Sequence, residues 1–117
     1  MPSRAFRNHN PGNLRYGAFA RRWGAREQDE QGFARFPSTR RGTLALVDLL
    51  FTRTYGRLSL ARALERYAPA QENPTQSYLR FVSSKSGVGP DEVLDRLSPA
   101  QHLRIAAAIS EFEGWRP

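Results

Sequence analysis

The chain has 117 residues, no cysteine and a formal net charge of +7. This length suffices for one domain with a modest core, so we expect residues 1–117 to form a single domain, and the lack of cysteine excludes disulfides, thiolate metal sites and cysteine nucleophiles. Because no run approaches the roughly 18 apolar residues of a membrane span and the first residues lack the apolar stretch of a secretory signal, we expect synthesis in the cytoplasm; action in the periplasm or cell wall then requires release, virion carriage or secretion.

The first feature along the chain is a polar loop over residues 7–15, Arg-Asn-His-Asn-Pro-Gly-Asn-Leu-Arg. Its three asparagines, interrupted by Pro11 and Gly12, do not fit the interior of a helix or strand, because proline lacks a donor and asparagine side chains form turns with their own backbone. Amides offer donors and acceptors without charge, which suits a ligand rich in hydroxyl and acetamido groups, such as a sugar. The alternative is a loop with structural turns only.

Residues 16–37 place aromatic side chains among glycines without a sustained helical period. Within them, residues 32–37 alternate apolar and polar side chains, which predicts a short strand that pairs with residues 14–16. The aromatic side chains suit either a small core under a long loop, which we favour, or a platform on which sugar rings stack. They are Tyr16, Phe19, Trp23, Phe33 and Phe36.

A first long helix is predicted from a Ser38 cap to Gly56, where a positive φ would end it. Its expected buried stripe consists of Leu44, Val47, Leu50, Phe51 and Tyr55. A second, short helix begins after a Ser59 cap, directs leucines and a tyrosine inward, and ends at residues 68–69. The inward side chains of this second helix are Leu60, Leu64 and Tyr67.

A third helix begins with the Asn-Pro-Thr-Gln segment at residues 73–76, which has the order of a cap, a proline at the first helical position and a glutamine two residues later. It directs Tyr78, Phe81 and Val82 toward the core and ends at Gly87. A short helical turn follows over residues 89–94.

The last helix begins at residues 98–101, Ser-Pro-Ala-Gln, and runs to about Phe112 before Gly114 ends it. About five helices therefore result. The fold class is mostly α, with at most a short β-hairpin near residues 14–36.

Helical phase separates the two glutamates of this last helix. At about 100° per residue, Glu111 falls beside the polar Arg104, whereas Glu113 falls between Ala106 and Ile109 inside the apolar arc. Burial disfavours the charged form of a carboxylate, which is the condition that a general acid requires near neutral pH. Since the helix ends here, the alternative is that Glu113 turns into water.

Other chemical groups give weaker signals. Asp29 lies in the aromatic loop and is a candidate second carboxylate, although solvation at the surface is its more ordinary role. His9 and His102 are distant in sequence, and no group of histidines and carboxylates has metal-ligand spacing, so we expect neither a metal nor a cofactor. Residues 1–41 contain nine arginines against three acidic residues. A surface with this charge attracts polyanions, and salt weakens that attraction.

Seven segments of the chain resemble a family of small phage-associated and effector-like proteins. The family pattern opens with Arg-x-Asn-Asn-Pro-Gly-Asn-Ile/Leu-Arg, continues with Gly-Phe-Ala-x-Phe and Gly-x-x-Ala-Leu, and ends with a helix that carries Glu before Gly. His9 departs from this pattern, because the family more often has asparagine there. The matching segments are residues 7–15, 23–24, 29–36, 42–46, 68–78, 87–88 and 112–114.

The same pieces also resemble lysozyme-like lytic transglycosylases and cell-wall glucosaminidases. In those enzymes a helix that ends in glutamate precedes an asparagine-rich loop and further helices, whereas here the glutamate-ending helix comes last. The resemblance implies a lysozyme-like domain that is circularly permuted, a change that is easy when chain ends lie close together. It requires Glu113 to lie beside residues 8–13.

The resemblance implies cleavage of peptidoglycan glycan strands, by a muramidase or a lytic transglycosylase, in a phage lysin or a secreted antibacterial effector. Glu113 would be the catalytic acid and then the base, with Asp29 as a weak candidate partner. An immunity protein, a virion or a secretion system would be its partner. The expected substrate-binding residues, which hold acetamido groups or orient Glu113, are Asn8, Asn10, Asn13, Arg15 and Tyr78.

Two alternatives remain. A non-catalytic virion or tail protein could use the same domain to bind cell wall without cleaving it. A small arginine-rich nucleic-acid binder is the second alternative. No helix in the basic first third has a continuous arginine stripe, so we expect no specific nucleic acid partner.

Overall fold

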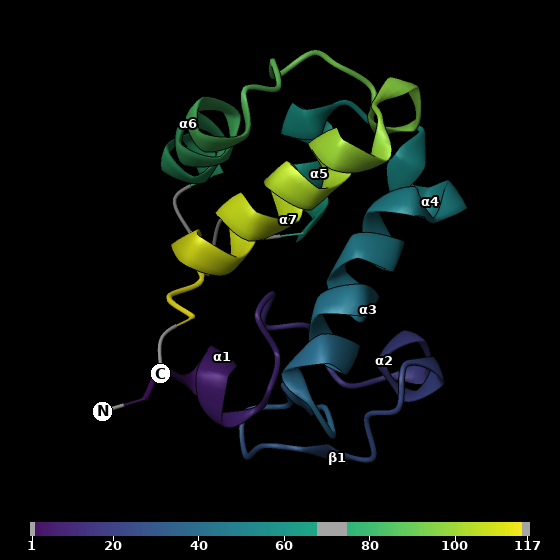
Figure 1. Cartoon of the computed structure of the whole chain (residues 1–117), viewed down its shortest axis with the longest axis vertical. Coiled ribbons are helices and arrows are strands. Elements are labelled where there is room, and N and C mark those ends of the chain that lie inside the picture. The colour runs from purple at the N-terminus through teal and green to yellow at the C-terminus, as the bar shows by residue number, and fades with distance from the viewer. Residues whose placement is uncertain (1, 68–74, 116–117) are drawn as a thin grey trace. The chain divides into compact units, whose positions relative to one another are not determined.

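The computed structural model describes residues 2–67 and 75–115. Among these residues the chain is mostly helical, with one small two-stranded antiparallel sheet (Figure 1). It divides into two compact units, one formed by Met1–Asp48 with Ile109–Pro117 and the other by Leu49–Ala108. The helices are α1 (Arg4–Arg7), α2 (Ala18–Arg22), α3 (Thr39–Phe51), α4 (Arg53–Gly56), α5 (Leu60–Tyr67), α6 (Thr75–Ser86), the 3-10 helix η1 (Leu94–Arg96) and α7 (Pro99–Phe112).

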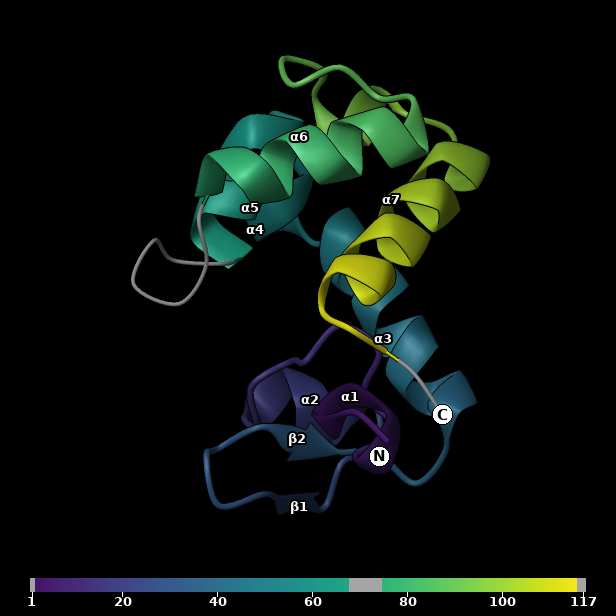
Figure 2. The same cartoon turned by 90° about the vertical axis from the view of Figure 1, so that its left-hand side faces the viewer.

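The unit that contains both ends of the chain, here called the terminal unit, holds the sheet. Strand β1 (Glu27–Gln28) pairs with β2 (Ala34–Arg35), as Figure 2 shows. The expected pairing of the 32–37 segment with residues 14–16 is confirmed, because Ala34 N donates to Leu14 O at 2.9 Å and Tyr16 N donates to Gly32 O at 3.0 Å.

Two short helices of the terminal unit, α1 and α2, were not predicted. Each ends in the same way, with a residue of positive φ and two backbone hydrogen bonds that close the last turn. In α1 that residue is His9, at φ 51°, and Asn10 N donates to Ala5 O at 2.8 Å. In α2 it is Gly24, at φ 99°. Helices of four or five residues are too short to show a hydrophobic period, so the sequence pattern could not reveal them.

The other unit, residues 49–108, contains α4, α5, α6, η1 and most of α7. Helices α5 and α6 pack together (Figure 2). As predicted, Ser59 caps α5 by accepting from Arg62 N at 3.2 Å, and Gly87 follows α6 with φ 75°. The predicted end of α5 at residues 68–69 and the predicted cap at residues 73–74 lie outside the described residues.

The predicted helix from Ser38 to Gly56 is wrong in its last five residues, 52–56. Thr52 interrupts it, because the Thr52 side chain accepts from Tyr55 N and starts α4 as a separate helix. Gly56 is the last residue of α4 but does not have a positive φ, and it faces Asp95 so closely that a Cβ at residue 56 would collide with the Asp95 carboxylate. Leu44 and Phe51, expected in the core, are 39% and 44% exposed.

Helix α7 begins and ends where the sequence predicts. Ser98 Oγ accepts from Gln101 N at 3.2 Å, and Gln101 Oε1 accepts from Ser98 N at 2.8 Å, so both partners of the capping box are in place. No helix within residues 2–67 and 75–115 has the length and apolar character needed to cross a membrane.

Candidate functional site

The end of α7 places Glu113 in the terminal unit. Gly114 adopts φ 81° and donates to Glu111 O at 3.1 Å, while Trp115 N donates to Ser110 O at 3.1 Å. This pair of bonds is a Schellman motif, which makes Glu113 the C-cap residue. Glu111 is exposed and Glu113 is half-buried, as helical phase predicts.

The asparagine-rich loop of the terminal unit is held in one conformation by Asn10. The Asn10 side chain is fully buried; its Nδ2 donates to Leu14 O at 3.0 Å and to Ala34 O at 2.9 Å, and its Oδ1 accepts from Leu14 N at 2.9 Å. Asn13, at φ 50°, has the left-handed backbone that asparagine tolerates better than most residues. A loop fixed in this way can hold a neighbouring side chain in a defined position.

Asn13 joins this loop to Glu113. Asn13 Nδ2 donates to Glu113 Oε1 at 3.0 Å and lies 3.4 Å from the backbone oxygen of Glu113, across 100 positions of sequence. The expected position of Glu113 beside residues 8–13 is therefore present in the terminal unit. The amide donor thus holds Oε1 of Glu113 as a hydrogen-bond acceptor.

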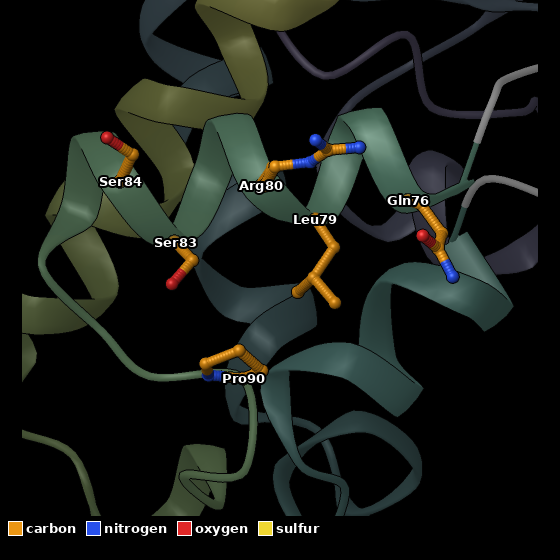
Figure 3. A pocket seen from close by; sticks show the side chains of 6 residues that line it. All are labelled: Gln76, Leu79, Arg80, Ser83, Ser84 and Pro90. Atoms are coloured by element: carbon orange, nitrogen blue, oxygen red, sulfur yellow. The ribbon is translucent and has the colours of Figure 1, made fainter.

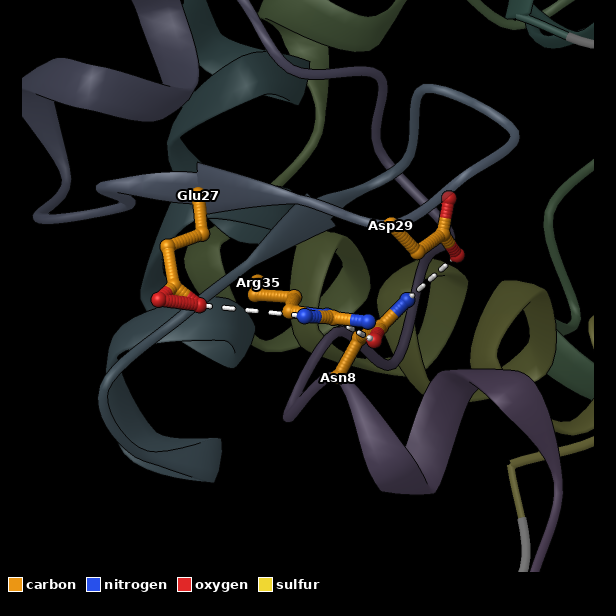
Figure 4. A network of polar contacts seen from close by, with 4 residues as sticks. All are labelled: Asn8, Glu27, Asp29 and Arg35. Atoms are coloured by element: carbon orange, nitrogen blue, oxygen red, sulfur yellow. Dashed lines mark hydrogen bonds and ion pairs between the residues drawn. The ribbon is translucent and has the colours of Figure 1, made fainter.

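The Asp29 carboxylate accepts hydrogen bonds from Asn8 and from the backbone of the hairpin. Figure 4 shows its Oδ2 accepting from Asn8 Nδ2 at 2.9 Å; Oδ1 accepts from Gln31 N at 2.9 Å and Phe33 N at 3.0 Å. Burial raises the pKa of Asp29, but the hydrogen bonds from Asn8, Phe33 and Gln31, together with the charge of Arg4, bring it below its ordinary value of 3.8.

Asn8 completes that network. Asn8 is 4% exposed, and Figure 4 shows its Oδ1 accepting from Arg35 Nε at 3.3 Å while Arg35 Nη1 lies 3.7 Å from Glu27 Oε1. Both ends of the Asn8 amide thus bind protein groups. Its role is to tie the loop to the hairpin.

Three of the five predicted substrate-binding residues therefore need correction. Asn8 and Asn10 are buried with their amides engaged inside the protein, and Tyr78 is fully buried in α6, so none of the three presents a surface to a sugar in this structure. The sequence showed polar residues in a loop but could not show which of them would be buried and hydrogen-bonded within the protein. Asn13 is the predicted residue that contacts Glu113.

Arg15 is exposed at the edge of the hairpin. Its Nη1 donates to Gln31 O at 2.6 Å, and its guanidinium lies 4.1 Å from the centroid of the Phe33 ring. The guanidinium of Arg4 lies 4.3 Å from the same centroid. Phe33 therefore holds two cations near one ring, which gives this part of the terminal unit a positive surface.

Two residues that support the site were missed. Gly42 lets α3 approach the loop, because a Cβ at residue 42 would collide with the backbone oxygen of His9. Trp115 packs on Phe6 with 5.4 Å between ring centroids and an interplanar angle of 58°. An aromatic residue directly after the glycine that ends a helix is a usable signal, since the residue after that glycine often makes a hydrophobic contact.

A separate depression of about 480 Å³ lies on α6 in the other unit (Figure 3). It contains none of the predicted site residues. Its lining residues carry no carboxylate, so they offer no general acid. They are Gln76, Leu79, Arg80, Ser83, Ser84 and Pro90.

The chain is similar to "Protein P5" of Pseudoalteromonas phage PM2, with 33% identity over 121 aligned residues that cover 98% of this chain and 74% of that protein. No protein-family model matches the chain.

Proposed function

The chain belongs to the family of Protein P5 of Pseudoalteromonas phage PM2, and from this premise we propose that it is a phage protein that cleaves the glycan strands of peptidoglycan with one catalytic glutamate, Glu113. The proposal includes both a lytic transglycosylase and a muramidase. It places the protein's action in the periplasm or cell wall, after release or as part of a virion.

The observation that carries the proposal is the contact between Asn13 and Glu113. A carboxyl group that serves as a general acid must be held at a fixed angle to the bond it protonates, because proton transfer requires hydrogen-bond distance and alignment. Asn13 supplies this restraint from an ordered loop, and the helix end supplies it through the backbone. A glutamate with no role beyond solvation at the surface does not require both restraints.

In the proposed reaction Glu113 acts first as a general acid. Its carboxyl group donates a proton to the glycosidic oxygen as the bond to the anomeric carbon breaks and positive charge develops on the sugar ring. The resulting carboxylate then accepts a proton from the nucleophile that attacks the anomeric carbon. That nucleophile is water in a muramidase and the sugar's own 6-hydroxyl in a lytic transglycosylase.

A single-carboxylate route fits the site better than a pair of carboxylates. A second catalytic carboxylate needs an oxygen available to the substrate or its water, about 5–9 Å from the first. Both oxygens of Asp29 accept hydrogen bonds from the hairpin and Asn8. We therefore propose that Asp29 shapes the loop and that Glu113 works without it.

The positive surface around Phe33 supports a polyanionic target. Arg4 and Arg15 lie near its ring, and the intact chain has a net charge of +7. Cell walls that carry anionic polymers attract such a surface, and salt screens the attraction.

The direct test compares the wild-type chain with Glu113→Gln and Glu111→Gln. Both substitutions replace a carboxyl group near the end of α7 with an amide, and glutamine at residue 113 keeps an oxygen for Asn13 while losing the acid. We expect Glu113→Gln to release soluble muropeptides from purified sacculi at least about 100-fold more slowly, and Glu111→Gln to match the wild type. Mass spectrometry of the products separates anhydro ends from reducing ends.

Equal activity of Glu113→Gln and the wild type rejects the role of Glu113. Binding of all three chains to sacculi without any release supports the second candidate, a virion protein that binds cell wall without cleaving it. That candidate is kept because the similar protein belongs to a phage.

A further inference from the structure

Two buried polar atoms of the terminal unit have no hydrogen-bond partner among the described residues. They are Asn13 Oδ1, which can only accept, and Trp115 Nε1, which can only donate. Buried polar atoms are nearly always paired in folded proteins, so each orphan calls for an explanation. Two orphans of opposite character, one on a residue bonded to Glu113 and one two residues after it, point to a ligand that carries an acceptor and a donor.

Local structure fixes both atoms. Asn13 Nδ2 is engaged by Glu113, which sets the direction of the Asn13 amide and hence of Oδ1. The Trp115 backbone is held by its bond to Ser110 O, and the indole packs on Phe6. The chain's other tryptophan is a useful contrast, because Trp23 Nε1 donates to Asp48 Oδ2 at 3.1 Å.

We propose that Asn13 Oδ1 and Trp115 Nε1 bind one secondary amide of the substrate. The amide oxygen accepts from Trp115 Nε1–H, and the amide N–H donates to Asn13 Oδ1. This inference rests on the proposed function and narrows it, because a secondary amide occurs both in the acetamido groups of the glycan strand and in the peptide stems attached to it. The site would hold that amide beside the acid.

Such a site would select its substrate strongly. When a protein is built to hydrogen-bond a polar group, an analogue that lacks the group leaves the buried atoms unpaired and binds poorly. Both orphan atoms lie below the surface in this structure, so side chains must rotate when the amide enters. Rotamer changes of this kind are common on binding.

The test uses NMR of the full chain carrying Glu113→Gln, so that no ligand is consumed. The two indole N–H signals are followed during titration with tri-N-acetylchitotriose, with cellotriose, which has hydroxyls in place of acetamido groups, and with N-acetylalanine methylamide, which has peptide amides and no sugar. We expect the Trp115 signal to move with an amide ligand, the Trp23 signal to stay, and cellotriose to bind at least about 5-fold more weakly than the acetamido sugar.

Trp115→Phe and Trp23→Phe form a matched pair in the same background. Each removes one indole N–H, keeps an aromatic ring and identifies one NMR signal. We expect Trp115→Phe alone to lose the preference for the amide ligand, with both variants unfolding at temperatures close to the parent. A Trp115 signal that follows the sugar assigns the amide to the glycan, and one that follows only the methylamide assigns it to the peptide stem.

A Trp115 signal that stays fixed with every ligand, or a preference that survives in Trp115→Phe, overturns the amide site. Either outcome leaves the proposed function intact if the wild type still releases muropeptides and Glu113→Gln does not. Failure of the cleavage assay itself is read separately, from the sacculi.

Discussion

Asn8, Asn10 and Asn13 lie within six residues of one another, yet each side-chain amide has a different partner. Asn8 binds the Asp29 carboxylate, Asn10 binds the backbone on both sides of the loop, and Asn13 binds Glu113. The first two amides hold the loop in shape, so the third can hold Glu113. A substitution at any of the three would affect the carboxylate, but through different contacts.

Asp29 gives the terminal unit a dependence on acid. Because its pKa in the folded chain lies below 3.8, its stabilising contribution is fully present above the unfolded-state value and is lost as the pH falls through the folded-state value. We expect the urea midpoint of the wild type to fall between about pH 4 and pH 2 more steeply than that of Asp29→Asn, which cannot titrate.

The matched control for that measurement is Glu30→Gln, since Glu30 is the exposed neighbour of Asp29. It should keep the steep acid dependence of the wild type. Parallel curves for Asp29→Asn and the wild type would show that the Asp29 hydrogen bonds contribute nothing to stability, and would reopen its role in the reaction.

The sequence identified Glu113 and Asp29 as candidate carboxylates but did not predict the hydrogen bonds around them. Helical phase separated Glu113 from Glu111, because a helix repeats with a fixed angle per residue. It could not show that Asn10 is buried or that Asp29 is engaged, because both depend on residues up to 24 positions away in the chain. His9 is a similar case: its left-handed backbone at the end of α1 is the kind of position that asparagine also occupies often, so the departure from the family pattern is explained by backbone shape.

Among the elements, α3 illustrates how one missing side chain positions the loop. Gly42 lies in the first turns of α3, where alanine would ordinarily stabilise a helix by up to about 1 kcal/mol. Here the added methyl group would meet the backbone oxygen of His9 and the ring of Pro11. The backbone cannot yield as a flexible side chain can.

We therefore expect Gly42→Ala to destabilise the protein by about 1–3 kcal/mol and to reduce muropeptide release, because the loop that carries Asn13 must shift. Urea unfolding measures the first effect and the sacculus assay the second. Gly17→Ala is the control: nothing lies within 4 Å of its added Cβ, and we expect a change within about 0.5 kcal/mol. A Gly42→Ala chain as stable as the wild type would show that the loop is not tightly held.

Caps and glycines predicted the later helices well, and tertiary contacts explain the failures. The start of α7 could be predicted because the two hydrogen bonds between Ser98 and Gln101 join residues that are close in sequence. Gly56 gave a wrong helix end, because its backbone is helical and the absence of a side chain makes room for Asp95, 39 positions later. The break at Thr52 has a local cause, because the Thr52 side chain caps α4. The prediction followed the spacing of the apolar residues and missed this cap.

At the scale of the whole molecule, the terminal unit is built from both ends of the chain. Residues 109–117 belong to the same compact unit as residues 1–48, and Trp115 packs on Phe6 as Asn13 binds Glu113. The candidate site therefore does not exist in either segment alone.

A chain that stops after Ser110 should lose order in the loop. We expect the backbone amides of residues 10–14 to exchange hydrogen at least about tenfold faster than in the wild type, while those of α5 and α6 stay unchanged, because the residues removed belong to the terminal unit. Hydrogen exchange followed by mass spectrometry measures both regions. The full-length variant Glu111→Ala, which alters an exposed carboxylate of the same helix, should exchange as the wild type does, and unchanged loop exchange after truncation would mean that the loop stands without Glu113.

The 100 positions between Asn13 and Glu113 also imply a delay between the synthesis of the two residues. At about 5–20 residues per second, a ribosome needs roughly 5–20 seconds to add the glutamate after the asparagine has been made. Until then the loop lacks its Glu113 partner, so a chain that has not yet reached residue 113 cannot carry out the proposed reaction. The site is complete only when residues 100 positions apart have both been made.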